Sequence, residues 1–358
     1  MNLDHKRILI VKPSSLGDVV HTLPLVHAIK RSYPLSYISW IVQKSFTDVV
    51  TADPAVDEII PISIPSTSDP NAARGALLSA FAATVREWRQ LRRRLDQNPC
   101  DLVLDLHASF RSGLLGLANP DGLRIGFAHA RELNTLFQQE LVHPDPSKPH
   151  AVDQNLAFAE YLCVGVLPQD FRVVIDPSAR ERVRSFLTEA GITERDGIIY
   201  ANPAARWATK LWTAEGWARL GDLLVSKTGA RVVFAGGPGD VPLIQSIMDR
   251  MKEKALNSAG KLSLAEAAAL LEAAVVYVGV DSGPMHIAAF VGTPVVALFG
   301  PTDPAKVGPY GTGNKVVRRE DLDCLACRKR ACPDRKCLED IRPEEVFEEV
   351  VRMVAREK

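Results

Sequence analysis

Short apolar runs alternate with amphipathic stretches along the whole chain, and Val, Ile and Leu dominate the runs. The first run, residues 8–11, is too short for a helix and has no polar face, which is typical of a strand buried on both sides of a parallel sheet. Residues 12–17 then form a small polar loop, and apolar positions at helical spacing resume at Val20. The pattern predicts a strand, a loop and a helix at the start of the fold.

The same alternation recurs in two sets, separated by a turn-rich stretch at residues 165–170. It predicts an α/β protein of two doubly wound, Rossmann-like domains, residues 1–167 and 168–340, followed by an amphipathic helix in residues 341–358. We expect that last helix to pack back on the first domain. The predicted strands are residues 8–11, 37–42, 58–62, 101–106 and 124–127 in the first set, and 197–200, 231–235, 274–280 and 292–300 in the second.

Composition supports two ordinary globular domains. The 358 residues exceed what one hydrophobic core usually serves, and 46% of them are hydrophobic and 24% charged. Lys and Arg total 43 and balance 43 Asp and Glu, which does not favour nucleic acid as a partner. No apolar run reaches the length of a membrane span or of a signal-peptide core, so we expect a cytoplasmic protein.

Asp18 is the first candidate for chemistry. It opens the predicted helix directly after the first strand, and ligands of open α/β sheets bind beyond the carboxyl ends of the strands. A carboxylate there can serve as an acid, a base or a sugar ligand, or it can simply cap the helix. A second loop of this kind, residues 107–113, follows the strand at 101–106.

The second set offers groups suited to phosphate. Lys210 follows the strand at 197–200 and can neutralise a phosphate as a point charge. Ser282 and Gly283 open a helix whose free N–H groups suit a diphosphate. Residues 236–240 form a Gly-rich turn in which Asp240 can bond a ribose hydroxyl, although the spacing differs from the dinucleotide-binding pattern and also fits a plain tight turn.

Basic residues in the first set allow an anionic partner. Arg131 and His150 can hold an acidic group or be ordinary surface residues. The predicted helix at residues 81–95 has a cationic face that suits an anionic substrate or membrane surface, or is only solvated. Its arginines are Arg86, Arg89, Arg92, Arg93 and Arg94.

Four of the six cysteines are close together near the end of the chain. Cys324, Cys327, Cys332 and Cys337 have the spacing C-x2-C-x4-C-x4-C, which fits either a structural Zn²⁺ site or free or paired thiols. The one D-x-D motif, at Asp321 and Asp323, does not follow a predicted buried strand, which disfavours a catalytic metal clamp there.

Four motifs in order resemble those of the bacterial lipopolysaccharide heptosyltransferases of glycosyltransferase family 9. Residues 11–24, Val-Lys-Pro-Ser-Ser-Leu-Gly-Asp-Val-Val-His-Thr-Leu-Pro, look like the opening signature in its type I form. The other three resemble the donor-binding motifs: Thr-Lys-Leu-Trp at 209–212, Gly-Val-Asp-Ser-Gly-Pro-Met-His at 279–286 and Phe-Gly-Pro-Thr-Asp-Pro at 299–304. The resemblance implies a GT-B fold, in which two Rossmann-like domains face a central cleft.

The resemblance further implies an inverting, metal-independent transfer of L-glycero-D-manno-heptose from ADP-heptose to Kdo of Kdo-lipid A, at the cytoplasmic face of the inner membrane. Asp18 is then the general base, and Lys210 takes the charge of the leaving diphosphate. The implied donor residues are Thr209, Asp240, Leu262, Asp281, Ser282, Gly283 and His286, and the implied acceptor residues are Ser15, Gly17, His107, Arg111 and Arg131.

The chain departs from the type I pattern in two places. Small apolar residues follow Asn202 where type I members have Thr hydroxyls, and the cysteine-rich tail resembles that of type II-like members. A type II-like acceptor or another nucleotide sugar is therefore an alternative within the family. A non-catalytic nucleotide-sugar binding protein is the alternative of a different class, and the presence of Asp18 and Lys210 argues against it.

Overall fold

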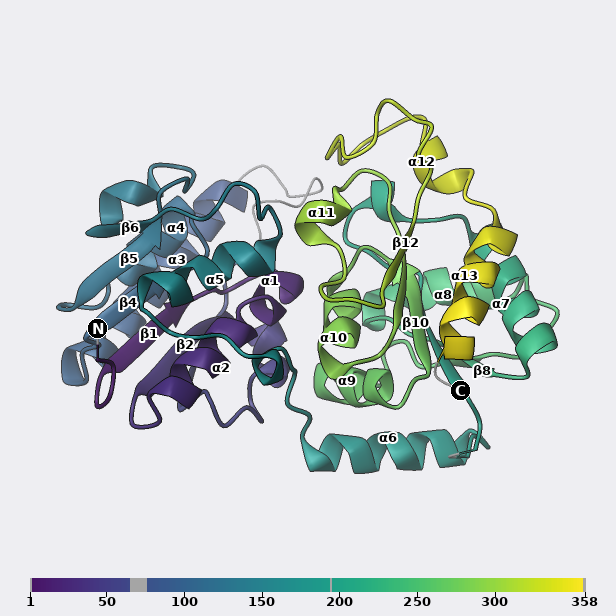
Figure 1. The fold of residues 1–358 in the computed structure, drawn as a ribbon, viewed down its shortest axis with the longest axis horizontal. Coiled ribbons are helices and arrows are strands. Elements are labelled where there is room, and N and C mark those ends of the chain that lie inside the picture. Colours follow the sequence, from purple (N-terminus) through teal and green to yellow (C-terminus); the bar gives the residue numbers. More distant parts are fainter. Residues whose placement is uncertain (1, 65–75, 194, 357–358) are drawn as a thin grey trace. The chain divides into compact units, whose positions relative to one another are not determined.

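The computed structural model describes residues 2–64, 76–193 and 195–356, which divide into two compact units, Met1–Arg172 and Val173–Lys358. Each unit is a six-stranded parallel sheet with helices on both faces (Figure 1). The predicted fold class, an α/β protein of two doubly wound domains, is thereby confirmed.

The first sheet has the strand order β3-β2-β1-β4-β5-β6, and every pairing is parallel. Its central strands are apolar throughout, because helices cover both faces and leave no solvent-facing side. The strands are β1 (Arg7–Val11), β2 (Tyr37–Gln43), β3 (Glu58–Ile62), β4 (Leu102–Asp105), β5 (Leu123–Phe127) and β6 (Glu140–Val142).

Two pairs of helices cover this sheet. Helices α2 and α5 pack against each other, as do α3 and α4. On α3, Leu91 and Leu95 are buried against the sheet residues Leu9, Val11 and Val103. The helices of the unit are α1 (Leu16–Val20), α2 (Leu23–Ser32), α3 (Ala76–Gln97), α4 (Phe110–Gly116) and α5 (Ala151–Tyr161), with 3₁₀ turns η1 (Lys44–Val49), η2 (Asn134–Phe137) and η3 (Pro168–Asp170).

The second sheet repeats this topology with the order β12-β11-β10-β7-β8-β9, again all parallel. In both sheets the chain starts in the middle, builds outward to one edge, and then returns to build the other half. The strands are β7 (Ile198–Asn202), β8 (Arg231–Phe234), β9 (Leu256–Asn257), β10 (Val276–Val280), β11 (Val295–Leu298) and β12 (Lys315–Val317).

Helices α6, α9 and α10 pack together in the second unit, and α7 packs with α8 and α13. Thr213 caps α7 at its start by accepting a hydrogen bond from the Gly216 N–H, and Gly229 ends it with a φ of 70°. The helices are α6 (Pro177–Glu189), α7 (Ala214–Thr228), α8 (Val241–Met248), α9 (Leu264–Glu272), α10 (Gly283–Val291), α11 (Pro304–Val307), α12 (Lys336–Glu339) and α13 (Pro343–Arg356), with 3₁₀ turns η4 (Ala208–Lys210) and η5 (Pro238–Asp240).

The last helix packs in the core of its own unit. Val346, Val350 and Met353 of α13 are buried in the core of the second unit, where α13 contacts α7, β10, β11 and β12. The apolar stripe of α13 is thus buried against the sheet of the second unit.

The topology of each sheet indicates where a ligand would bind. Strand order reverses between β1 and β4 in the first sheet and between β7 and β10 in the second, and ligands of such sheets bind at this switch point. Among the described residues, no helix is both long and apolar enough to cross a bilayer.

Candidate active site

The switch point of the first sheet is flanked by the loop after β1 and the loop after β4. The first loop leads into α1 and contains Ser15, Gly17 and Asp18, and the second leads into α4 and contains His107. Because β1 and β4 are hydrogen-bonded neighbours, their carboxyl ends bring the two loops together.

Asp18 is both a helix cap and a candidate for chemistry. Its Oδ2 accepts hydrogen bonds from the backbone N–H of Ser15 at 2.8 Å and from the Ser15 hydroxyl at 2.7 Å. Its Oδ1 lies 3.8 Å from Nζ of Lys12, and the Asp18 side chain remains 41% exposed. One oxygen therefore fixes the carboxylate while the side chain still reaches the surface of the unit.

Lys12 is the residue at this site that sequence reasoning missed. Its side chain is only 10% exposed, and Nζ donates to the Leu106 carbonyl oxygen at 2.5 Å, which ties the β1 loop to the β4 loop. Partial burial alone would raise the pKa of Asp18, but the Lys12 ammonium and the Ser15 hydrogen bonds outweigh it and lower that pKa well below its usual range. Asp18 is therefore ionised at neutral pH.

His107 is neutral at the same place. Burial lowers its pKa to about 4, and the neighbouring Lys12 and Arg111 act in the same direction, against a raising effect of Asp18 and a backbone hydrogen bond to Ser14. A neutral imidazole beside Asp18 is able to donate or accept one hydrogen bond to a substrate hydroxyl.

The remaining residues predicted for the acceptor lie around these two loops. Gly17 is buried in α1, and Arg111 is half-buried in the first turn of α4. Arg131 is exposed, and its backbone N–H donates to the Ala108 carbonyl at 3.1 Å, which attaches it to the β4 loop. His150 instead caps α5, its Nδ1 accepting from the Val152 N–H at 3.2 Å.

A buried carboxylate supports the β4 loop from beneath. Asp105, at the end of β4, is 1% exposed, and its Oδ1 accepts from the backbone N–H groups of His107 and Ala108 at 3.0 and 3.2 Å. Burial raises the pKa of Asp105, although the hydrogen bonds oppose this. Its Oδ2 accepts from the side chains of Ser112 at 2.9 Å, Asn134 at 2.7 Å and Gln138 at 3.1 Å.

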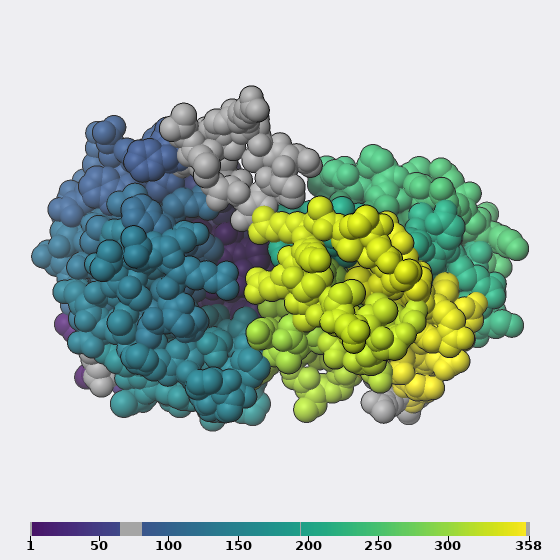
Figure 2. Space-filling view, turned by 90° about the horizontal axis from the view of Figure 1, so that it is seen from above, coloured from purple at the N-terminus to yellow at the C-terminus, as the bar shows by residue number. Residues whose placement is uncertain are grey.

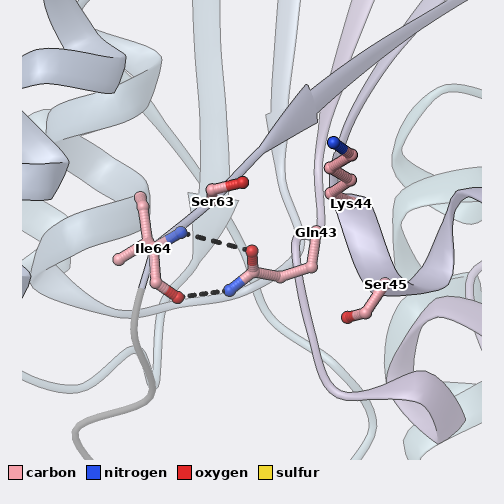
Figure 3. A pocket seen from close by; sticks show the side chains of 5 residues that line it. All are labelled: Gln43, Lys44, Ser45, Ser63 and Ile64. Carbon is pink, nitrogen blue, oxygen red and sulfur yellow. Dashed lines mark hydrogen bonds between the residues drawn. The ribbon is translucent and has the colours of Figure 1, made fainter.

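A pocket of about 520 Å³ lies at the carboxyl ends of β2 and β3, next to the β1 loop (Figure 3). The Gln43 amide closes one side through two hydrogen bonds to the backbone of Ile64, at 2.5 and 3.3 Å, and the Gln43 N–H donates to the Pro13 carbonyl. The side chains of Lys44, Ser45 and Ser63 line the rest. The pocket thus offers one cation and two hydroxyls.

The basic face of α3 is partly neutralised by acids of its own unit. Arg94 pairs with Glu58 through Nε at 2.9 Å, and Arg92 pairs with Asp96 at 2.9 Å. Arg86, Arg89 and Arg93 are exposed. This face is therefore less strongly cationic than the sequence alone indicates.

In the second unit, the switch point between β7 and β10 holds a buried ion pair. Nζ of Lys210 lies 2.6 Å from Oδ2 of Asp281, with the two side chains 17% and 6% exposed. The Thr302 hydroxyl donates to the same oxygen at 2.6 Å. Three of the sequence motifs, around Lys210, Asp281 and Thr302, thus converge on one carboxylate, and Asp281 fixes the position of the Lys210 ammonium.

Ser282 and Gly283 start α10 at the same edge. The Ser282 side chain does not cap the helix; its hydroxyl accepts a hydrogen bond from the Asn202 amide at 2.7 Å. The first N–H groups of α10 are consequently not satisfied by the Ser282 side chain, as an anion site requires. His286 is buried within the first turns of the helix.

Asp240 and Leu262 lie on neighbouring strand ends. Oδ2 of Asp240 accepts from the Gly237 N–H at 2.8 Å and so closes the Gly-rich turn after β8. Leu262 is half-buried in the loop between β9 and α9. Both residues follow strands on the β8 side of the switch point, where β8 neighbours β7 and β9.

Thr209, one of the predicted donor residues, lies in η4 directly before Lys210. It is buried, and its hydroxyl donates to the Lys329 carbonyl at 2.8 Å. The contact attaches the Lys210 loop to the cysteine-rich segment, a connection that no sequence signal indicates.

The structure does not support the prediction of a zinc site at Cys324, Cys327, Cys332 and Cys337. Within the described residues no group of three or more His, Cys, Asp or Glu side chains is placed to hold a metal ion. All four thiols are free, and the Cys332 thiol donates to the Asp334 carbonyl at 2.9 Å. Asp321 of the D-x-D motif pairs with Arg319 at 2.7 Å.

Comparison with known proteins decides the family. The model of glycosyltransferase family 9 (heptosyltransferase) matches residues 88–338. The chain belongs to glycosyltransferase family 9. It is therefore a glycosyltransferase.

Several curated family 9 relatives align with most of the chain. Lipopolysaccharide core heptosyltransferase OpsX of Haemophilus influenzae is 28% identical over 87% of this chain and 84% of its own length. Lipopolysaccharide heptosyltransferase 1 of Pseudomonas aeruginosa is 28% identical over 93% and 89%. Lipopolysaccharide heptosyltransferase 3 of Escherichia coli is 26% identical over 86% and 89%.

Solved structures agree with this assignment. The glycosyltransferase family 9 protein of Veillonella parvula superimposes with a TM-score of 0.83 at 25% identity, covering 99% of each chain. The Escherichia coli heptosyltransferase WaaC with ADP gives a TM-score of 0.73 at 25% identity, covering 97% of this chain and 99% of that one. The likenesses confirm the expected GT-B fold class.

Proposed function

We propose that this family 9 enzyme transfers L-glycero-D-manno-heptose from ADP-heptose to a Kdo sugar of the lipopolysaccharide inner core, with inversion at the anomeric carbon. The observation that supports this most is the position of the Asp18 carboxylate, which Ser15 and Lys12 fix at the switch point of the first sheet. The names of the relatives supply the heptose and the lipopolysaccharide, and the ADP in the WaaC structure supports the nucleotide.

In this proposal Asp18 accepts the proton of the acceptor hydroxyl. The hydroxyl oxygen forms a bond to the anomeric carbon of the heptose while the bond from that carbon to the diphosphate oxygen breaks, and ADP leaves with the electron pair. A base works best when it is unprotonated at the working pH and within hydrogen-bond reach of the proton. The lowered pKa of Asp18 meets the first condition, and its exposure at the sheet edge is compatible with the second.

The second unit is proposed to hold the donor. Lys210, fixed by Asp281, neutralises charge that grows on the diphosphate, and the N–H groups at the start of α10 add hydrogen bonds. Asp240 and Leu262 are proposed neighbours of the ribose and the adenine, and His286 of the donor sugar or its loop. None of these roles requires a metal ion.

The acceptor is proposed to bind along the carboxyl edge of the first sheet. Kdo is a sugar acid, so a positively charged edge favours it. His107, Arg111 and Arg131 line the β4 loop, and the pocket with Lys44 extends the same edge past β1. Because the acceptor is part of a lipid, we propose that the enzyme works at the cytoplasmic face of the inner membrane.

The test is a transfer assay with ADP-heptose and two acceptors, Kdo-lipid A and Kdo-lipid A that already has one heptose. Mass spectrometry of the lipid product and release of ADP report the same reaction independently. We expect heptose to be transferred to the first acceptor, Kdo-lipid A, at the same rate with and without EDTA. Transfer to the second acceptor alone would assign a type II-like reaction.

Two other outcomes contradict the proposal more strongly. Tight ADP-heptose binding with no transfer to either acceptor would favour another acceptor, or the alternative of a nucleotide-sugar binding protein. Turnover with a different nucleotide sugar, and none with ADP-heptose, would show that the donor is wrong while the family 9 assignment stands.

A further inference from the structure

The turn around η2, between β5 and β6, has its apolar side chains on the outside. Leu133 is 67% exposed and Leu136 is 76% exposed, whereas Asn134 between them is completely buried. Phe110, the first residue of the neighbouring helix α4, is 42% exposed. A turn that only faces water buries its leucines and exposes its amide, so this arrangement is the reverse of the usual one.

Buried contacts fix the turn in this arrangement. Nδ2 of Asn134 donates to Oδ2 of Asp105, at the end of β4, at 2.7 Å. The rings of Phe110 and Phe137 pack edge to face, with their centres 5.1 Å apart. Gly113 of α4 leaves the space for Phe137, since a Cβ at this position would overlap the ring. The two leucines are therefore held at the surface by a well-anchored support.

The backbone at the start of the turn is in a conformation that its residues disfavour. Glu132 and Leu133 have φ values of 55° and 61°, in the left-handed region that glycine adopts most easily. Residues other than glycine that are held in this region are found most often at functional sites. The outward placement of Leu133 thus has a cost in backbone strain, which indicates that the exposed side chain has a use.

Basic side chains accompany the apolar ones. Nε of Arg124 donates to the Phe137 carbonyl at 2.8 Å, and this acceptor is neutral, so the contact leaves the charge of Arg124 uncompensated. Arg131 is exposed directly before the turn. In the part of the chain that the structure describes, neither guanidinium forms an ion pair with a carboxylate. The one acid of the turn is Glu132, whose Oε2 accepts a hydrogen bond from the Phe110 N–H at 3.2 Å.

This part of the surface adjoins the proposed acceptor loops. The Arg131 N–H donates to the Ala108 carbonyl at 3.1 Å, and Phe110 follows His107 by three residues in the chain. Figure 2 shows a broad face of the first unit formed by residues in the blue and teal part of the colour bar, to which α4 and η2 belong. An acceptor sugar bound at His107 would therefore have these apolar side chains close to it.

We propose that Phe110, Leu133 and Leu136, together with Arg124 and Arg131, form a membrane-docking surface that inserts into the headgroup region of an anionic phospholipid bilayer. The inference rests on the proposed lipid acceptor and adds where the protein meets the membrane. Leu and Phe side chains bind a bilayer by burial at the acyl boundary, while basic side chains attract anionic headgroups.

Charge favours a bilayer over a second copy of this chain as the occupant. In a two-fold symmetric dimer through this surface, the same patch would face itself. The arginines of one copy would then lie near those of the other, which is unfavourable. An anionic bilayer offers the opposite charge to both arginines and an apolar layer to the leucines.

The experiment compares Leu136→Ser with Leu35→Ser. Leu35 is a matched control, because it is 61% exposed in the turn before β2, at the opposite edge of the same sheet. Co-sedimentation with vesicles of equal parts phosphatidylcholine and phosphatidylglycerol gives the membrane affinity of each full-length protein. We expect Leu136→Ser to weaken binding at least about fivefold, and Leu35→Ser to leave it within about twofold of the wild type.

The charge of the vesicle tests the arginines. Wild-type binding should be at least about tenfold weaker on phosphatidylcholine alone, and rising salt should weaken binding to the anionic vesicles, because the attraction of the guanidiniums is lost or screened. Arg124→Gln should weaken binding to the anionic vesicles about fivefold. Equal affinity of the wild type for both kinds of vesicle would overturn the assignment to an anionic bilayer.

Transfer assays with two forms of the acceptor separate this inference from the proposed function. Leu136→Ser should be slower than the wild type with Kdo-lipid A in vesicles, and equal to it with Kdo-lipid A from which the acyl chains have been removed. A wild type that binds vesicles through Leu136 but transfers no heptose to either form would support the membrane-docking surface while the proposed function fails.

Three outcomes would overturn the membrane-docking surface and leave the proposed transfer intact. The first is equal vesicle affinity in Leu136→Ser and the wild type, and the second is a wild type that binds no vesicles. The third is a dimer in analytical ultracentrifugation that Leu136→Ser dissociates, since this would assign the surface to a second copy of the chain.

Discussion

Asp18 shows how far single residues are predictable from the sequence. Its place after a buried strand marked it for capping or for chemistry, and in the structure one carboxylate oxygen binds Ser15 while the other lies toward Lys12. The sequence could not reveal Lys12 as its partner, because a lysine at the end of a strand is most often a solvated loop residue. Only the fold shows that this side chain is buried between two loops.

The Lys12–Asp18 contact predicts a pH effect. Lys12 lowers the pKa of Asp18, so the base form is present from acid pH through neutrality. The titration of Asp18 should therefore not change kcat/KM between pH 5 and 8. In Lys12→Met the burial of Asp18 is no longer opposed by the cation, so its pKa rises. We expect the acid limb of the pH–rate profile to move to higher pH, so that activity falls more at pH 5 than at pH 8.

The profile is measured from initial rates between pH 4 and 9. Lys6→Met is the matched control, since Lys6 pairs with Asp101 at the surface of the same unit. An unchanged acid limb in Lys12→Met would show that the cation does not set the protonation of the base.

At the scale of elements, the sequence predicted the strands that are four or more residues long. The strands it missed, β6, β9 and β12, are two or three residues long and lie at or near the sheet edges. Such strands form because a neighbouring strand offers hydrogen-bonding groups, and their own residues show little pattern. The contact of Trp207 with Arg330 was equally invisible, because it joins segments far apart in the chain.

The β4 loop depends on the buried network around Asp105. Replacing Asp105 by Asn keeps the volume but turns an acceptor into a donor that faces the donors of Ser112, Asn134 and Gln138. We expect the free energy of unfolding of the first unit to fall by about 2–4 kcal/mol, since buried polar groups lose their partners. Urea denaturation followed by circular dichroism measures this change.

The exposed Asp121 of the same unit provides the control, and Asp121→Asn should change the free energy of unfolding by less than about 0.5 kcal/mol. If Asp105→Asn were equally neutral, the network would not be what stabilises the loop that contains His107.

At the scale of the molecule, each unit has its own sheet and its own helices on both faces, and α13 completes the second unit. We therefore expect two unfolding transitions in scanning calorimetry. Because the proposed donor site lies in the second unit, ADP should raise the midpoint temperature of one transition only. At a hundredfold excess of ADP over Kd, the free energy of unfolding of that unit should rise by about 2.7 kcal/mol.

Lys210→Met should reduce that ADP-dependent shift without changing the other transition. A uniform shift of both transitions would place the nucleotide elsewhere or show that the units unfold together.

The central claim is that Asp18 is the base of heptosyl transfer, and the most direct measurement compares Asp18→Asn with the wild type in single-turnover transfer from ADP-heptose to Kdo-lipid A. Asn keeps the shape of the side chain but cannot accept the acceptor proton as a carboxylate does. We predict a loss of transfer rate of at least about 100-fold, with ADP-heptose affinity within twofold of the wild type. Transfer at the wild-type rate would contradict the account and assign the proton to another group.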